Sequence, residues 1–155
     1  MTKFSEIHRQ VLNTLKSSTI AAMEDYDIEL MLNDMIIRAV ANFRFPKISL
    51  TYHEVEDNND TVEFEFDNTI TQREINVLLA LVKLAWLEQQ LDNEVNFDNV
   101  YYDKDVRIHS RGNLLKAIQD RYTMAKQEAK TAQYDYQRIA GDGNPAVKDI
   151  YESSI

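Results

Sequence analysis

The sequence contains no cysteine and very little glycine or proline, with 3 Gly and 2 Pro among 155 residues. Without cysteine the chain cannot form a disulfide, a thiolate metal site or a cysteine nucleophile. Because few Gly and Pro leave few points at which a helix must break, the composition favours long helices. The length fits one domain that can bury a sizeable core without covalent help.

Long apolar runs and an excess of positive charge are missing as well. No segment reaches the ~18 apolar residues that cross a bilayer, and residues 1–6 lack the apolar core of a signal peptide. We therefore expect a soluble, cytoplasmic protein without membrane contacts. The formal net charge is −9 at pH 7. Since affinity for the phosphate backbone comes from many Lys and Arg contacts, this charge disfavours a protein that coats duplex DNA.

Apolar residues at helical spacing predict two helices in the first part of the chain. The first covers residues 3–16, and the second runs from about Asp25 to Asn42 with a broad apolar face. The second helix should end before Pro46, because the residue preceding a proline disfavours helical dihedral angles.

Beyond Pro46 the apolar period changes from helical to alternating. Residues 48–53 and 62–66 alternate apolar and polar side chains around the turn-forming residues 57–60, which predicts a β-hairpin at about 47–67. Seven acidic residues and no Lys or Arg lie between Glu54 and Asp67. The outward face of the hairpin should therefore be acidic. We interpret it as a solvated face, because the glycine and ligand order of a calcium loop is missing.

A helix start follows the hairpin. Thr71 and Glu74 have the spacing of a capping box, in which a hydroxyl and a carboxylate each accept a hydrogen bond from an unpaired backbone N–H. From Ile75 to Leu91 apolar residues occupy nearly every side, which predicts a helix that is buried all round. We assign no regular structure to the Asn- and Asp-rich stretch after Leu91.

The longest predicted helix runs from Ser110 to about Ala140, roughly 45 Å, and ends at Gly141, Gly143 and Pro145. Its apolar residues recur in alternating steps of three and four, which is the pattern of a coiled-coil seam. The seam consists of Leu115, Ile118, Tyr122, Ala125, Ala129, Ala132, Tyr136 and Ile139. Because three of these residues are alanine, another helix can approach closely, either within the subunit or from a neighbouring one.

Residues 141–155 are predicted to form a flexible C-terminal arm, because their apolar residues are too few to fold alone. The overall prediction is a mainly α fold: a helical bundle in residues 1–140 with a long C-terminal helix, one inserted β-hairpin, and the arm at 141–155. The candidate interface residues are Tyr122, Ala125, Ala129, Ala132, Tyr136, Ile139, Val147, Ile150, Tyr151 and Ile155.

Motifs of catalysis and cofactor binding are not evident in the sequence. His8, His53 and His109 belong to different segments without metal-ligand spacing. Gly141 and Gly143 precede a proline, so they do not form a phosphate-binding loop. We therefore expect no enzyme activity, cofactor, metal or small-molecule substrate. A catalytic triad that only the fold would assemble stays open.

Lys and Arg are concentrated in the C-terminal part of the chain, from Lys104 onward, whereas the predicted hairpin is acidic. Copies of the chain could dock head to tail, with acidic against basic surface. An ordinary solvated surface of mixed charge explains the same residues equally well.

The order of helix, helix, β-hairpin, buried helix, long helix and flexible tail resembles the head-to-tail connector (neck adaptor) proteins of tailed bacteriophages. The resemblance is carried by the buried run Thr71–Leu91, which includes Ala85–Glu88, and by the block Ser110–Ala117. It implies a homo-oligomeric ring, a dodecamer, that joins the portal protein of the capsid to downstream neck or tail proteins. It also implies a location in the host cytoplasm during assembly and in the virion neck afterwards.

In such a ring DNA would pass nearby without sequence-specific binding, and an acidic wall would let the duplex slide. Two alternatives from other classes stay open. One is a small helical regulatory or protein-binding module, which would act as a monomer or dimer. The other is a small hydrolase or nuclease, which would need a cleft with converging acidic residues.

Overall fold

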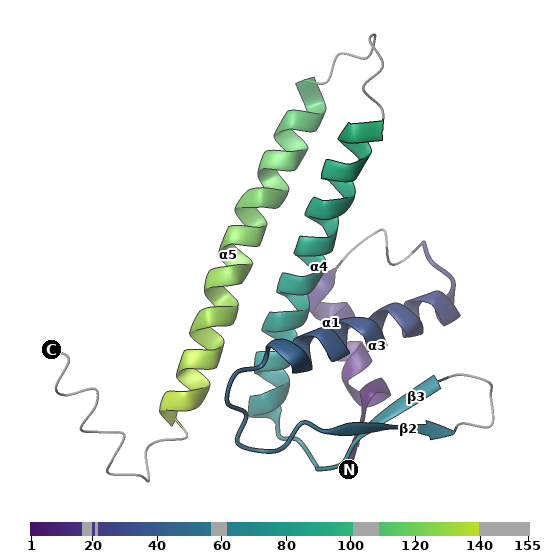
Figure 1. Cartoon of the computed structure of the whole chain (residues 1–155), viewed down its shortest axis with the longest axis vertical. Coiled ribbons are helices and arrows are strands. Elements are labelled where there is room, and N and C mark those ends of the chain that lie inside the picture. Colours follow the sequence, from purple (N-terminus) through teal and green to yellow (C-terminus); the bar gives the residue numbers. More distant parts are fainter. Residues whose placement is uncertain (17–19, 21, 57–61, 101–108, 140–155) are drawn as a thin grey trace, which may run out of the picture.

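Two long helices dominate the computed structural model, which describes residues 1–16, 20, 22–56, 62–100 and 109–139. They are α4 (Gln72–Val100) and α5 (His109–Ile139), which lie side by side and run in opposite directions (Figure 1). The other elements pack around the N-terminal half of α4: β1 (Thr2–Lys3), α1 (Phe4–Leu15), α3 (Asp25–Asn42), β2 (Tyr52–Glu56) and β3 (Val62–Phe66). The mainly helical prediction is confirmed.

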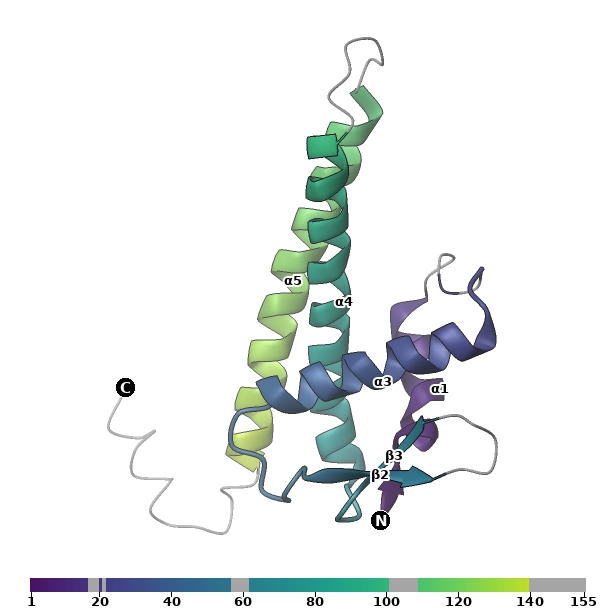
Figure 2. The same cartoon turned by 45° about the vertical axis from the view of Figure 1, so that its right-hand side comes forward.

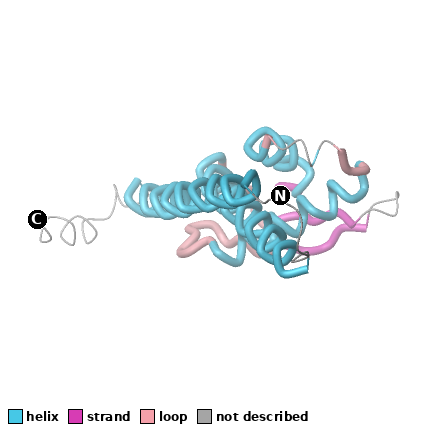
Figure 3. The backbone as a smooth tube through the Cα atoms, turned by 90° about the horizontal axis from the view of Figure 1, so that it is seen from above, coloured by secondary structure: helices cyan, strands magenta, loops and turns pink. Residues whose placement is uncertain are grey.

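A small antiparallel sheet with strand order β1-β3-β2 lies to one side of the helices (Figure 3). Tyr52 pairs with Phe66, so their side chains share a face of the sheet. Phe4, at the start of α1, is fully buried against this face, with ring centroids 5.4 Å from Tyr52, 5.5 Å from Phe64 and 4.8 Å from Phe66. This aromatic cluster fixes the sheet to the helices.

The predicted hairpin at 47–67 is present, but its first strand starts only at Tyr52. Further upstream the backbone bonds to side chains: the Lys47 N–H donates to Tyr136 Oη, and the Ser49 carbonyl accepts from Asn68 Nδ2. The hairpin also gains a third strand, because Thr2 and Lys3 pair with β3. Lys3 lies opposite Glu65, so the outward face is less acidic than the sequence suggested.

Helix α4 is longer than predicted. The Asn- and Asp-rich residues 92–100, to which the sequence analysis assigned no regular structure, continue it as far as Val100. This stretch contains neither Gly nor Pro, so nothing in it forces the helix to break. The prediction that the helix is buried all round is wrong for one side of it, because Asn76 is exposed and Leu79, Ala80, Lys83 and Leu84 are only partly buried. Among its described side chains Leu87 is the last buried one, and Glu88 is exposed.

Helix α3 crosses α4 (Figure 2) and ends next to the last turns of α5. There the Phe43 ring packs edge-on against Tyr136, with centroids 5.2 Å apart. The predicted long helix 110–140 agrees with α5 to within one residue at its start. Ala140 and the predicted arm at 141–155 lie outside the described residues.

Candidate interaction surfaces

The C-terminal half of the predicted seam packs inside the single chain. Ala125 and Ala129 are 0% and 2% exposed, and Tyr136 is also buried. Tyr122 and Ala132 are partly buried against the same core. The prediction that the seam packs on another helix is confirmed for these five residues, and the helix belongs to the same subunit, whereas Leu115 and Ile118 stay partly exposed. These residues therefore support the fold, whereas the surface available to a partner lies elsewhere.

Two polar contacts show how α4 and α5 are aligned, and this alignment explains why alanine suits the seam. Lys83 Nζ lies 2.6 Å from Glu128 Oε2, and Tyr136 Oη lies 2.7 Å from Glu74 Oε1. In an antiparallel pair with this register, Ala129 lies at the level of Val82, on the buried side of α4. A larger side chain at position 129 would push the two helices apart.

The side chain of Ile139 and residues Val147, Ile150, Tyr151 and Ile155 lie outside the described part of the chain. The arm as a partner-binding segment stays a prediction.

A buried polar cluster joins the first turn of α4 to the last turns of α5. Glu74 is 4% exposed, and its carboxylate accepts hydrogen bonds from the Thr71 backbone N–H at 2.9 Å, from the Thr71 hydroxyl and from Tyr136 Oη. The Thr71 hydroxyl oxygen in turn accepts from the Arg73 N–H at 3.3 Å. The predicted capping box is therefore confirmed, with Tyr136 as an additional donor that the sequence did not reveal.

Burial and hydrogen bonding act on this cluster in opposite directions. Burial alone would raise the pKa of Glu74, but the hydrogen bonds from Thr71 and Tyr136 outweigh it and hold this pKa below its ordinary value of 4.5. Burial, followed by the hydrogen bond to Glu74, raises the pKa of Tyr136 above its ordinary value of 10.0. At neutral pH the cluster thus consists of a carboxylate and a neutral phenol.

The same end of α5 fastens the segment that follows α3. Gln133 Oε1 accepts from the Arg44 N–H at 2.7 Å, and Tyr136 Oη accepts from the Lys47 N–H at 3.0 Å. Between these two points Phe45 is 77% exposed and has a φ of 56°, a left-handed conformation that side chains with a Cβ seldom adopt. The fold thus presents an aromatic ring to solvent at this turn.

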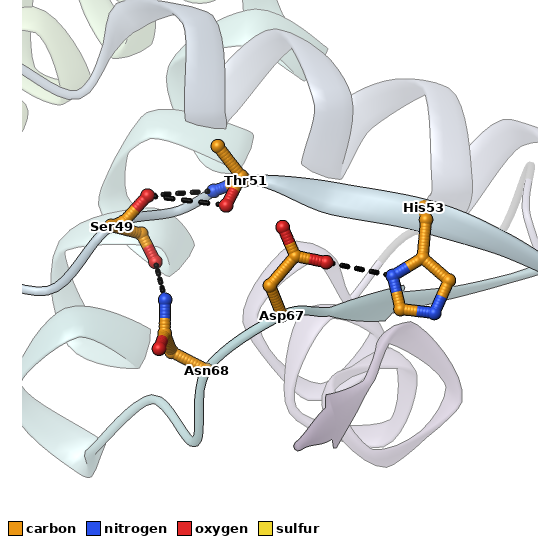
Figure 4. A network of polar contacts seen from close by, with 5 residues as sticks. All are labelled: Ser49, Thr51, His53, Asp67 and Asn68. Atoms are coloured by element: carbon orange, nitrogen blue, oxygen red, sulfur yellow. Dashed lines mark hydrogen bonds and ion pairs between the residues drawn. The ribbon is translucent and has the colours of Figure 1, made fainter.

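A second polar network joins the ends of the two hairpin strands (Figure 4). His53 Nδ1 lies 2.7 Å from Asp67 Oδ1, the Asp67 N–H donates to the Thr51 carbonyl at 2.9 Å, and Ser49 Oγ lies 3.1 Å from Thr51 Oγ1. Hydrogen bonding with the Thr51 side chain, and then with His53, holds the pKa of Asp67 below its ordinary value. This network supports the strand ends.

The network brings hydroxyl, imidazole and carboxylate groups close together, but the contacts connect them differently from a catalytic triad. A triad needs the hydroxyl hydrogen-bonded to the imidazole nitrogen that the carboxylate does not hold. In Figure 4 Ser49 bonds with Thr51 instead, while His53 turns its Nδ1 toward Asp67. We interpret the group as structural.

The other histidine whose side chain is described is held in a similar way. His8 Nε2 lies 2.9 Å from Asn33 Oδ1, and Asn33 is buried and donates to the Val62 carbonyl at 3.0 Å. Among the residues that the structure describes, no group of three His, Asp or Glu side chains could hold a metal ion. None of the described helices has an apolar stretch that could cross a membrane.

Exposed apolar side chains occur on α3 within a strongly acidic stretch. Tyr26 and Leu30, one helical turn apart, are 52% and 42% exposed. Asp27 and Asp34 are exposed on the same side of the helix. We call these four residues the acidic α3 face. Residues 22–37 contain five acidic side chains and no Lys or Arg, so the carboxylates dominate this end of the helix.

A face of opposite charge occurs on α5. Tyr134 is 48% exposed, and Lys130 and Arg138, one turn before and one turn after it, are exposed as well. We call these three residues the basic α5 face. The sequence analysis placed the basic charge in the C-terminal part of the chain and the acidic charge on the hairpin, but it did not identify the residues of either face. The seam pattern could have revealed the second one, because it turns Ala132 and Tyr136 inward and leaves Tyr134, between them, outside.

Comparison with models of protein families, with curated proteins and with solved structures gives no match.

Proposed function

We propose that this chain is a structural subunit of the head-to-tail connector of a tailed bacteriophage, forming a ring between the portal protein and downstream neck or tail proteins. The observation that carries the proposal is the order and proportion of the elements. Two shorter helices, a β-hairpin and a pair of long helices follow one another along the chain, which is the order of the neck adaptors that the sequence resembles.

Surface properties support a role in assembly. Exposed aromatic side chains lie on α3, on α5 and at Phe45, and aromatic residues are enriched in contacts between proteins. The net charge of −9 would keep single subunits apart before assembly and would repel DNA passing through a ring. In this proposal the protein binds its neighbours in the neck and catalyses no reaction.

The test starts from the genes that flank this one. We expect portal, terminase or tail genes there, and the portal protein encoded there should then be purified with the full chain. Negative-stain microscopy should show an additional ring on the portal that portal protein alone lacks.

An absence of binding to that portal, or a flanking region without virion genes, would contradict the proposal. A monomer or dimer bound to a soluble, non-virion protein would instead favour the alternative of a helical protein-binding module. The exposed α3 and α5 faces would serve that function as well.

A further inference from the structure

The acidic α3 face and the basic α5 face lie on opposite sides of the molecule. In Figures 1 and 2, α5 forms one edge, while the N-terminal end of α3 projects beyond α4 on the other edge. Each face has an exposed tyrosine flanked by charges of one dominant sign. They are therefore complementary both in charge and in their apolar centres.

Ion pairs within the chain offset part of the charge on each face, but Asp27 and Lys130 form no ion pair with another described residue, and the paired side chains stay accessible. Glu128 is paired with Lys83 of α4, so its charge is compensated inside the helical pair. Arg138 lies 4.0 Å from Asp135, and Asp34 lies 2.9 Å from Arg38; all four of these side chains remain about half exposed or more. Residues 112–138 of α5 still hold five basic and three acidic side chains.

We propose that the acidic α3 face of one subunit docks on the basic α5 face of a second copy of this chain. The identification of the partner rests on charge. Two copies with a net charge of −9 repel each other, so they associate best where a locally positive surface meets a negative one, and α5 provides that surface. The inference rests on the proposed function, because it assigns the contact that would build the ring.

The geometry of the contact determines the kind of assembly. Two different faces of the same molecule form a head-to-tail contact, and repetition of that contact closes a ring or extends a filament. A contact of α3 with α3, in contrast, would stop at a dimer. Tyr26 and Tyr134 should contribute most to binding, because tyrosine is enriched among residues that dominate interface affinity.

The absence of cysteine makes a direct test straightforward. We would introduce Leu30→Cys and Thr131→Cys into one chain and treat it with a short bismaleimide cross-linker. Thr131 is exposed beside the basic α5 face, so the change leaves Lys130, Tyr134 and Arg138 intact. A ladder of species larger than dimers is expected from the double variant, while each single variant should give little product.

The matched control pair combines Thr131→Cys with Leu12→Cys in place of Leu30→Cys. Leu12 lies on α1 and, at 37%, is about as exposed as Leu30. This control pair should give no ladder. Equal ladders from both pairs, efficient dimerisation of the Leu30→Cys single variant, or no cross-linking at all would each overturn the inference.

Charge reversal provides an independent measurement. The variant K130E/R138E should self-associate about tenfold more weakly or worse in sedimentation experiments at low salt. Mixing it with D27K/D34K should restore association between the two variants, since their charges are again complementary. The control K116E/K126E makes the same charge change elsewhere on α5 and should associate like the wild type.

The outcomes separate this inference from the proposed function. If K130E/R138E still forms a normal ring on the portal, the docking faces are wrong and the connector function stands. If wild type does not bind the portal but the two faces cross-link, the chain is a self-associating protein with another function. Failure of rescue in the mixture would also overturn the docking inference.

Discussion

The hydroxyl of Tyr136 offers the sharpest test of how the long helices are held together. Tyr136→Phe removes one oxygen and keeps the ring, so the edge-on contact with Phe43 at 5.2 Å is retained. The variant loses the donor to the buried carboxylate of Glu74 and the acceptor of the Lys47 N–H. The perturbation is therefore limited to two hydrogen bonds at one end of α5.

The expected cost follows from the charge and burial of Glu74. A hydrogen bond to a charged group contributes about 1.5–3 kcal/mol, and more is lost when the charge stays buried. We expect the free energy of unfolding to fall by about 2 kcal/mol at pH 7. For a chain of this length that corresponds to a decrease in Tm of about 4–8 °C.

Thermal unfolding followed by circular dichroism measures this decrease, and Tyr26→Phe is the matched control. Tyr26 is 52% exposed on α3, so loss of its hydroxyl should change stability by less than about 0.5 kcal/mol. If Tyr136→Phe melts like Tyr26→Phe, the cluster contributes nothing to stability and the reasoning is wrong.

The pH dependence of the two proteins provides a second readout. The pKa of Glu74 is lowered in the folded state, so its contribution is present above pH 4.5 and is lost as the pH falls below that value. Tyr136→Phe removes one of the hydrogen bonds that lower the pKa of Glu74, so this pKa should be higher in the variant than in the wild type. Acid unfolding of the variant should therefore begin at higher pH. The pKa of Tyr136 is raised in the folded state, so its neutral hydroxyl stabilises the wild type below pH 10.0 and this stabilisation is lost as the pH rises further. The variant lacks the hydroxyl and should show no such loss.

Two further predictions concern the seam and the arm. Ala129→Leu should lower the free energy of unfolding by about 1–3 kcal/mol, because the site is buried between helices. Ala117→Leu, at an exposed site on α5, should be nearly neutral. Equal denaturant midpoints for the two variants would contradict the packing of Ala129. A chain that ends at Ala140 should melt like the full chain but fail to join the ring on the portal. Normal ring formation would show that the arm is dispensable. A large loss of stability would show that the arm is part of the domain.

Local sequence patterns predicted those features that depend on neighbouring residues. The capping box at Thr71 and the inward face of α5 follow from spacings of three and four residues, and both are confirmed. The strand Thr2–Lys3 could not be predicted, since two residues carry no periodicity and their pairing with β3 depends on the fold. The partner of Tyr136 was equally hidden, because Glu74 is 62 residues away in the sequence.

The exposed faces were missed for a different reason. The apolar face predicted for α3 is buried or partly buried, whereas Tyr26 and Leu30 lie beside that face and stay exposed. Whether side chains at the margin of an apolar face are covered depends on where neighbouring elements end. That information is in the tertiary structure and not in the helical period.

The uneven burial along α4 and α5 implies that the helical pair does not open as a unit. Every described side chain from Gly112 to Met124 is at least partly exposed, and burial on α5 begins only at Ala125. Backbone amides near the far end of the pair should therefore exchange with solvent through local fraying, whereas those around Tyr136 should exchange only when the whole domain unfolds. Distorting the pair near Gly112 should therefore cost little free energy, while the end beside the sheet keeps its geometry.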